Sequence, residues 1–366
     1  ESAPNSTDLT WETVITKNIG LDLGFLNNRL NVSFDAYIRD TKDMLMAGKT
    51  LPGVYGASSP RMNVADLRTK GWEASITWGD SFTLASKPFN YRVMAGIGDN
   101  TSKVTKYDNP NRTLTDPYEG QQLGEIWGYV VDGYFKTDEE ARNYKVDQSF
   151  VNQMINASAL DNGLHAGDLK FVDLDGNNKI EQTTSANDRK DMKVIGNSLP
   201  RYNYNFGISA DWYGIDFSVL FQGIGKQNWY PGAETSMFWG PYSRPYASFI
   251  PSDFMSQVWS EENTDAYFPR PRGYVALGSN RELAVVNTKY LQNLAYCRLK
   301  NLSIGYTLPD KWLSKIGFEK IRVYFSGENL LTFTKLHSDY IDPEQASASN
   351  SWKTSKSDAN IYPWAK

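Results

Sequence analysis

One stretch, from Leu199 to Gly223, alternates apolar and polar residues without a break and constrains the fold more than any other part of the chain. The apolar positions are Tyr202, Tyr204, Phe206, Ile208, Ala210 and Trp212, then Phe217, Val219 and Phe221. Successive side chains of a β-strand point to opposite faces, so this period of two predicts two strands, each with one apolar and one polar face. The Tyr213-Gly214 turn between them predicts an antiparallel hairpin.

The length of the first run suggests what its apolar face contacts. At about 3.3 Å per residue, Tyr202 to Trp212 spans roughly 33 Å. Tilted by about 40°, such a strand rises close to 25 Å, the height of the lipid-facing band between the aromatic girdles of a membrane β-barrel. A strand of a soluble β-sandwich would show the same alternation, so the hairpin alone leaves both interpretations open.

The composition excludes several classes of protein. The chain has 366 residues, and its mean hydropathy of -0.52 and lack of a long apolar run exclude helical membrane spans, although barrel strands need only alternate. With 38 Lys and Arg against 42 Asp and Glu, there is no basic footprint for nucleic acid. A single cysteine, Cys297, excludes an internal disulfide. No signal peptide begins at Glu1, so we expect an internal piece of a longer protein.

Six further stretches alternate in the same way, at 10–25, 29–39, 72–78, 91–97, 301–308 and 321–326. The eight predicted strands are joined by short turns at 27–28, 79–88, 213–214 and 309–319, and by long loops at 46–63, 101–200, 226–289 and 335–361. Short turns at one end and long loops at the other are typical of outer-membrane barrels. Within the second long loop we expect a hairpin at 124–135 and a short helix around 138–145, capped by Thr137.

Six blocks of the sequence resemble the C-terminal part of SusC/RagA-type TonB-dependent transporters of Gram-negative outer membranes. They cover nearly the whole chain in the family's order: LTWETVITKNIGLDLGFLNNRLNVSFDAYIRDTKDML, NVADLRTKGWEASITW, GDLKFVDLDGNNKIE, IGNSLPRYNYNFGIS, VWSEENTDAYFPRP and RLKNLSIGYTLPDKWLSKIGFEKIRVYFSGENLLTFT. The fold we predict is all-β: an antiparallel transmembrane β-barrel, partial in this chain, with about eight membrane strands and long extracellular loops.

The resemblance implies more than the alternation does. It implies a 22-stranded barrel with an N-terminal plug, energised through TonB in the outer membrane and covered by a SusD-like lipoprotein that captures glycans or peptides. Residues 1–366 would be the C-terminal part of this barrel. The plug, the TonB-contacting segment, the earlier strands and the final closing strand are absent from the chain, which alone cannot form a closed transporter.

An acidic stretch resembles part of a calcium-binding loop. Oxygen-bearing side chains alternate after Asp173, as in an EF-hand, but Thr184 stands where a bidentate carboxylate belongs, unless a longer loop uses Asp188. The candidate residues are Asp173, Asp175, Asn177, Lys179, Glu181 and Asp188. The alternative is a loop held by Asx turns without an ion. Calcium here would be structural, and we expect no required cofactor.

The loop that follows the hairpin is rich in aromatic residues. We consider six of them as candidate contacts to the substrate or to a partner: Trp229, Tyr230, Phe238, Trp239, Tyr242 and Tyr246. The alternative is that these rings pack the loop against itself, because a loop of this length must be ordered by its own side chains.

Nothing in the sequence predicts catalysis. His165 and His337 are the only histidines, both in loops, and no nucleophile motif is present. The function we predict is therefore import of oligosaccharides or peptides, with a SusD-like lipoprotein, TonB and outer-membrane lipid as partners and no nucleic acid. The alternative is a small outer-membrane or surface β protein that binds glycans or partners without transport.

Overall fold

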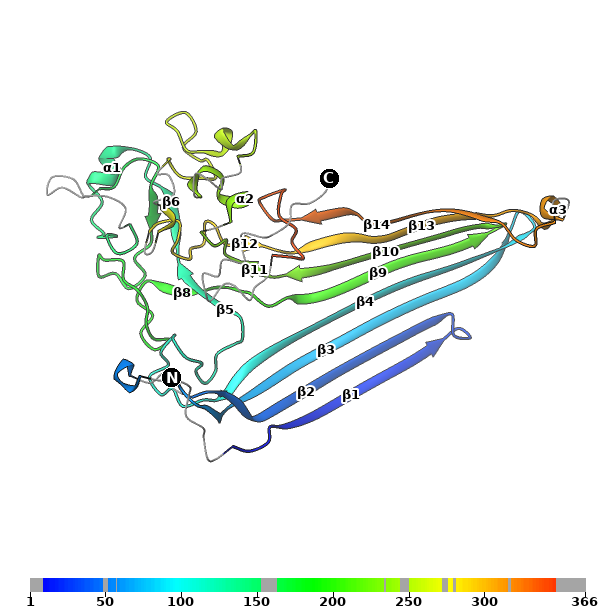
Figure 1. Ribbon diagram of the computed structural model, residues 1–366, viewed down its shortest axis with the longest axis horizontal. Coiled ribbons are helices and arrows are strands. Elements are labelled where there is room, and N and C mark those ends of the chain that lie inside the picture. Colours follow the sequence, from blue (N-terminus) through cyan, green and yellow to red (C-terminus); the bar gives the residue numbers. More distant parts are fainter. Residues whose placement is uncertain are drawn as a thin grey trace.

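Eight long strands form one antiparallel sheet in the computed structural model (Figure 1). The structure describes residues 9–48, 52–56, 58–152, 163–233, 235–243, 250–271, 276–278, 281–314 and 317–346. In spatial order the strands are β1 (Thr13–Phe25), β2 (Leu30–Ala47), β3 (Arg61–Leu84), β4 (Lys87–Lys106), β9 (Arg201–Trp212), β10 (Ile215–Lys226), β13 (Tyr296–Thr307) and β14 (Arg322–Thr334). The predicted eight strands and their antiparallel order are confirmed.

The pairing register keeps apolar side chains on one face of this sheet across successive strands. One row runs through paired residues from β1 to β10: Leu23, Val32, Ile76, Ala95, Phe206 and Phe221. The rings of Phe206 and Phe221 stack with centroids 4.7 Å apart. Many of these side chains are exposed, including Ile76 at 46% and Ile208 at 44%. We call this side of the sheet the apolar face.

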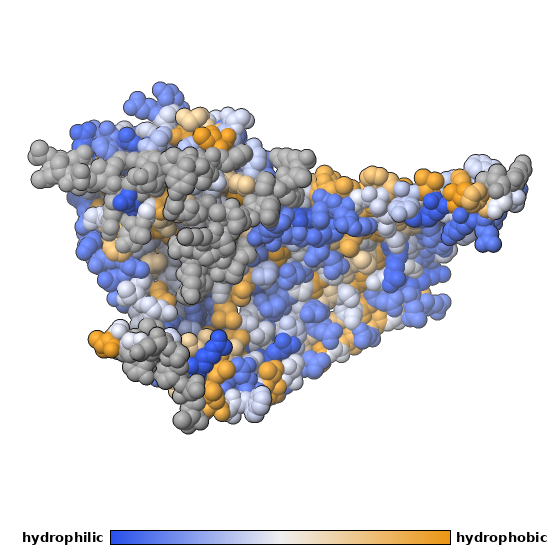
Figure 2. All heavy atoms as spheres, in the orientation of Figure 1, coloured by the Kyte–Doolittle hydropathy of each residue, from blue (hydrophilic) through white to orange (hydrophobic). Residues whose placement is uncertain are grey.

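The opposite face carries polar residues in equally continuous rows. The row next to the apolar one contains Asp22, Ser33, Ser75, Gly96, Asn205 and Gln222. A slip of one residue in any strand would move its apolar side chains onto this side, so the alternation in the sequence fixes the register. We call this side the polar wall. In Figure 2, apolar side chains gather along the upper edge of the sheet near α3 (Asp310–Leu313).

The two ends of the sheet differ as predicted, although the strands are longer than the sequence indicated. The turn predicted at 79–88 contains only Ala85 and Ser86, both with positive φ, because β3 and β4 continue to Leu84 and from Lys87. The turn at Tyr213-Gly214 is confirmed, with φ of 48° and 83°. At the other end, β3 begins at Arg61, inside the predicted loop 46–63, where the short helix η1 (Gly53–Tyr55) also lies.

The predicted hairpin at 124–135 is wrong. Its two halves are strands, β5 (Glu125–Tyr129) and β6 (Val131–Tyr134), but they do not pair with each other. β5 pairs with β8 (Met192–Asn197), and β6 pairs with β7 (Leu169–Phe171). Only Val130 separates β5 from β6, which is too short a link for a two-residue hairpin turn. The predicted helix is confirmed in place but is shorter: α1 spans Asp138–Arg142, and the Thr137 hydroxyl accepts a hydrogen bond from the Glu140 N–H.

The long loops pack together into one compact unit at one end of the sheet (Figure 1). Its main hydrophobic core draws on all three of the longest connections, through Tyr129 and Phe171, Trp239 and Phe268, and Ile341. We call residues 107–200, 227–295 and 335–346 the loop domain. Its remaining short elements are β11 (Asn228–Trp229), α2 (Ser236–Trp239), η2 (Gly240–Tyr242), η4 (Phe254–Gln257) and β12 (Gln292–Asn293). Among the described residues, no helix is long and apolar enough to cross a membrane.

An ion pair at the short-turn end spans three strands and depends on a glycine. Arg322 of β14 donates two hydrogen bonds to Asp216 of β10, at 2.9 and 2.5 Å, across Gly305 of β13. A Cβ atom at Gly305 would lie 2.5 Å from Arg322 Nη2 and 2.6 Å from Asp216 Oδ1. A side chain at this position would therefore displace the pair.

We expect Gly305→Val to lower the free energy of unfolding by about 1 kcal/mol, the upper range for an exposed ion pair. The measurement is denaturant unfolding of the detergent-purified protein. Ser303→Val, on the same strand and face, is the control and should cost less. In an Arg322→Ala background the cost of Gly305→Val should largely disappear; an undiminished cost would contradict this explanation.

Candidate functional site: the polar wall and the loop domain

The polar wall is hollowed midway along its strands. A cavity of about 370 Å³ opens on this face between β2, β3, β4 and β9. Its polar lining consists of Ser33, Asp35, Glu73, Ser75, Asn203 and Asn205. We call this cavity the wall hollow. These residues lie inside their strands and away from the ends, so the hollow is on the wall itself and not in the loop domain.

Glycines make room for the side chains of the wall hollow. A Cβ atom at Gly98 would lie 3.2 Å from Glu73 Cγ, and one at Gly96 would lie 3.2 Å from the Asn205 amide nitrogen. On the neighbouring strand, a Cβ atom at Gly20 would lie 2.5 Å from Asp35 Oδ1. Small residues on β1 and β4 thus let longer polar side chains of β2, β3 and β9 lie across the wall.

The two carboxylates of the wall hollow stand directly opposite each other. Asp35 of β2 is the register partner of Glu73 of β3. Directly opposed residues have Cβ atoms about 4.5–5.5 Å apart, and like charges at this position are destabilising. Both residues are exposed, and none of the ion pairs between described residues includes either of them. The sequence analysis did not select this pair, because its charges become neighbours only through the strand register.

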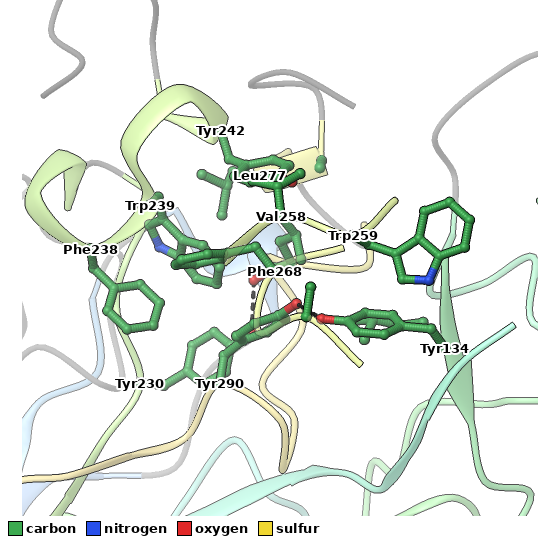
Figure 3. Packing of buried hydrophobic residues seen from close by; sticks show 14 of the residues in the cluster. Tyr134, Tyr230, Phe238, Trp239, Tyr242, Val258, Trp259, Phe268, Leu277 and Tyr290 are labelled. Carbon is green, nitrogen blue, oxygen red and sulfur yellow. Dashed lines mark hydrogen bonds between the residues drawn. The ribbon is translucent and has the colours of Figure 1, made fainter. Parts of the chain in front are cut away.

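Five of the six predicted aromatic contact residues lie in the core of the loop domain. Trp229, Tyr230, Phe238, Trp239 and Tyr242 are each at most 7% exposed. In Figure 3 the rings of Phe238, Trp239 and Tyr290 face one another. Side chains this deeply buried offer no surface to a ligand, which supports the alternative that they pack the loop against itself. Tyr246, the sixth, lies outside the described residues.

Polar groups of these rings are satisfied inside the core. The Tyr230 hydroxyl donates to the Leu283 carbonyl at 2.8 Å, and Trp239 Nε1 donates to the Gly232 carbonyl at 3.0 Å. Burial raises the pKa of Tyr230, and it raises that of Tyr267 to about 12. The phenols therefore stay protonated at neutral pH and act as hydrogen-bond donors that fix the loop conformation.

A second cavity, of about 260 Å³, lies in the loop domain between α2, η4 and the segment after β14. Its lining includes Phe254, Asp253 and His337. The imidazole of His337 stacks on Tyr267 with ring centroids 3.5 Å apart, and Nε2 lies 2.8 Å from Gln257 Oε1. Burial lowers the pKa of His337, so the ring is neutral at pH 7. The other histidine, His165, is on a different loop beside Asp138.

The candidate calcium residues form a tight turn, and one ligand candidate differs from the prediction. Carboxylate oxygens of Asp173 and Asp175 lie within 4.8 Å of those of Asp191. The sequence analysis instead proposed Asp188, which is exposed and whose N–H donates to the Ser185 carbonyl. Asp173 accepts hydrogen bonds from the N–H groups of Gly176 and Asn178, both at 2.7 Å. This is the Asx-turn geometry of the alternative, so calcium binding stays a prediction.

The other candidate calcium residues interact mainly with one another. The side chain of Asn177 accepts from the Lys179 N–H at 2.8 Å, and Glu181 lies 3.6 Å from the Lys179 ammonium and 3.4 Å from that of Lys190. Asp191 is fully buried, and its two oxygens accept from the N–H groups of Leu174 and Glu181. Burial and the nearby charges of Asp175 and Asp173 raise the pKa of Asp191.

A buried arginine ties the end of the described chain to the wall. Arg298 of β13 donates to Asp342 at 2.5 Å and to Glu344, and its Nε donates to the Thr332 hydroxyl at 2.7 Å. Glu344 also contacts Lys300 at 2.8 Å. The Arg298 side chain is only 3% exposed, so its charge depends on these partners. The segment after β14 is thereby held against the mouth of the wall.

The geometry is that of a curved antiparallel wall with one apolar face, one polar face and a folded loop domain at one end, and comparison with known proteins agrees with it. The family described as "TonB dependent receptor-like, beta-barrel" matches residues 2–330. The chain belongs to this family, and its fold is a partial TonB-dependent barrel. This confirms the resemblance on which the sequence analysis relied.

Several characterised relatives are similar over nearly the whole chain. TonB-dependent receptor P3 of Formosa agariphila is 30% identical over 92% of the chain, and TonB-dependent receptor SusC of Bacteroides thetaiotaomicron is 24% identical over 98%. A solved structure of the RagAB peptide importer in its open-open state is similar in fold, with a TM-score of 0.62 and 22% identity over 92% of the chain. The chain spans about a third of the length of each of these proteins, 31%, 31% and 32%.

Arg298→Met should release the segment that follows β14. Removing one partner of a buried ion pair leaves the other charges uncompensated, at a cost of about 3 kcal/mol. Hydrogen exchange of peptides covering 336–346 should therefore accelerate, while exchange within β9 and β10 stays unchanged. Arg92→Met, on the polar wall, is the control. Unchanged protection of 336–346 would show that the ion pairs do not hold this segment.

The raised pKa of Asp191 predicts how the stability of its turn depends on pH. An unfolded aspartate ionises near pH 4; the folded turn favours the protonated form, so the contribution of Asp191 is fully present below that pH and is lost as the pH rises through the folded pKa. In EDTA, the protection of residues 173–191 in wild type relative to Asp191→Asn should fall from pH 4 to pH 7. Hydrogen exchange corrected for intrinsic rates measures this.

Calcium, if it binds the same carboxylates, should reverse that loss. Adding millimolar calcium at pH 7 should slow exchange of residues 173–191 in the wild type and have no effect on Asp173→Asn. Magnesium is the control, because its octahedral geometry is more demanding. Equal exchange with calcium and with EDTA would leave a turn held by hydrogen bonds alone.

Proposed function

We propose that this chain is the C-terminal part of the barrel of a SusC-type importer in the outer membrane of a Gram-negative bacterium. The observation that carries the proposal is the division of the eight-stranded sheet into an apolar and a polar face, with a folded loop domain at one end only. In this proposal the transporter takes up oligosaccharides or peptides and is energised through TonB, by parts of the protein outside this chain.

The apolar face supports a lipid environment. Its side chains are exposed along the whole sheet, whereas monomers in water rarely expose apolar patches larger than a few hundred Å². A membrane also requires every backbone group to be paired within the protein, and antiparallel strands closed into a barrel meet this requirement. The same alternation that leaves apolar side chains exposed here is thus stable when lipid covers them.

The polar wall and the loop domain support a path for a hydrophilic solute. A barrel lined by serine, asparagine and acidic side chains holds water, and the wall hollow offers convergent polar groups. The loop domain, by family polarity, would face the cell exterior and meet a SusD-like lipoprotein. The names of two similar proteins, SusC and the RagAB peptide importer, favour import over a purely adhesive role. The proposal includes no catalytic step.

Uptake by cells carrying the complete gene tests the proposal. We expect deletion of the gene to abolish growth on one class of oligosaccharide or peptide, and deletion of TonB or of a neighbouring SusD-like gene to have the same effect. The matched control is growth on the corresponding monosaccharide or amino acids, which should be unaffected. Normal growth of the deletion strain on oligomers, with loss of surface adhesion instead, would favour the binding protein without transport.

A further inference from the structure

The wall hollow carries a concentrated negative charge on an otherwise mixed surface. Asp35 and Glu73 line it, and Asp22 accepts a hydrogen bond from the lining residue Ser33. The lining residues include no lysine, arginine or histidine. Elsewhere on the polar wall, acidic residues have partners: Asp216 pairs with Arg322, and Asp211 accepts from Asn90 at 2.8 Å.

The geometry points to a cationic occupant. Two carboxylates in direct cross-strand register repel each other, and a positive charge between them removes this cost. Asn203 and Asn205 stand on the neighbouring strand, and their amide oxygens add acceptors for the N–H groups of such a cation. All four side chains are exposed in the described structure and so are accessible from the lumen side.

The size and ligand set favour an organic cation over a metal ion. A cavity of about 370 Å³ is large enough for a lysine or arginine side chain with its water. Within the described residues, the acidic group close enough to hold a metal ion is the Asp173, Asp175 and Asp191 turn, and not the wall hollow. Two carboxylates flanked by amides instead match the several N–H donors of an ammonium or guanidinium group.

We propose that the wall hollow binds the ammonium or guanidinium group of a basic peptide as it passes along the lumen. This inference rests on the proposed import function and specifies its substrate class. The hollow lies midway between the loop domain and the short turns, at Ser33 to Asp35 on β2 and Gly96 to Gly98 on β4. A solute moving between the two ends of the wall must pass this position.

Binding of a defined peptide to the complete protein in detergent tests the inference. The probes are tri-lysine and the same peptide acetylated on every side-chain nitrogen, measured by isothermal titration at low salt. We expect wild type to prefer tri-lysine, and the double variant Asp35→Asn, Glu73→Gln to lose this preference by about tenfold or more. Raising the salt to about 1 M should weaken the preference, because it shortens the Debye length to about 3 Å.

Asp211→Asn is the matched control, since it removes an acid from the same face outside the hollow. Equal binding of the two peptides to wild type, or an equal loss in the Asp211→Asn protein, would overturn the inference. A double variant with unchanged peptide binding but altered thermal stability would also overturn it, because the cation would then come from the protein itself.

The inference and the proposed function fail separately. Binding in detergent needs no energy source, so tri-lysine binding without TonB-dependent uptake in cells would leave the cation site and contradict import. TonB-dependent uptake of both peptides at equal rates would support import and contradict the cation site.

Discussion

The cross-strand register of the eight long strands is the constraint on which the rest of the structure depends. Every strand is paired so that Leu23, Val32 and Ile76 share one face while Asp22, Ser33 and Ser75 share the other. Because side chains alternate strictly, a single register determines both the surface that lipid can cover and the surface that water can wet. The wall hollow follows from the same register, since it places Asp35 opposite Glu73.

The loop domain obeys different physics from the wall it sits on. Its core is closed and aromatic, with Trp229, Trp239 and Tyr290 at most 1% exposed, as in a water-soluble domain. The wall instead exposes apolar groups on one side and polar groups on the other. Arg298 joins the two parts, because it belongs to a wall strand and binds acidic residues of the segment after β14.

Most of the wall was predictable from the sequence, because a period of two needs no tertiary information. The strands around Ile19, Phe206 and Ile304 lie where the alternation put them, and the turn at Tyr213-Gly214 was set by local conformational preference. The ends of β3 and β4 were missed because the polar and turn-forming residues near Gly79 were interpreted as a connection.

The loop domain and the candidate site were less predictable. The runs around Trp127 and Tyr134 are strands, but their partners lie about 40 to 70 residues away, and no local signal selects β8 or β7. Likewise, an aromatic residue in a loop has the same composition whether it contacts a ligand or a core, and burial decided this for Trp239. Asp191 was missed because its distance from Asp173 along the chain exceeds that of a standard calcium loop.

The shared core of the loop domain has a consequence for the order of assembly. Tyr129 precedes β9, whereas Leu336 and Ile341 follow β14, yet all three pack in one cluster. The core therefore cannot be completed until the last described strand has been placed beside its neighbours. Contacts so distant along the chain form late and slowly. A finished loop domain is thus a record that the wall beneath it has been laid down in full, and an unfinished strand would leave the exterior surface unformed.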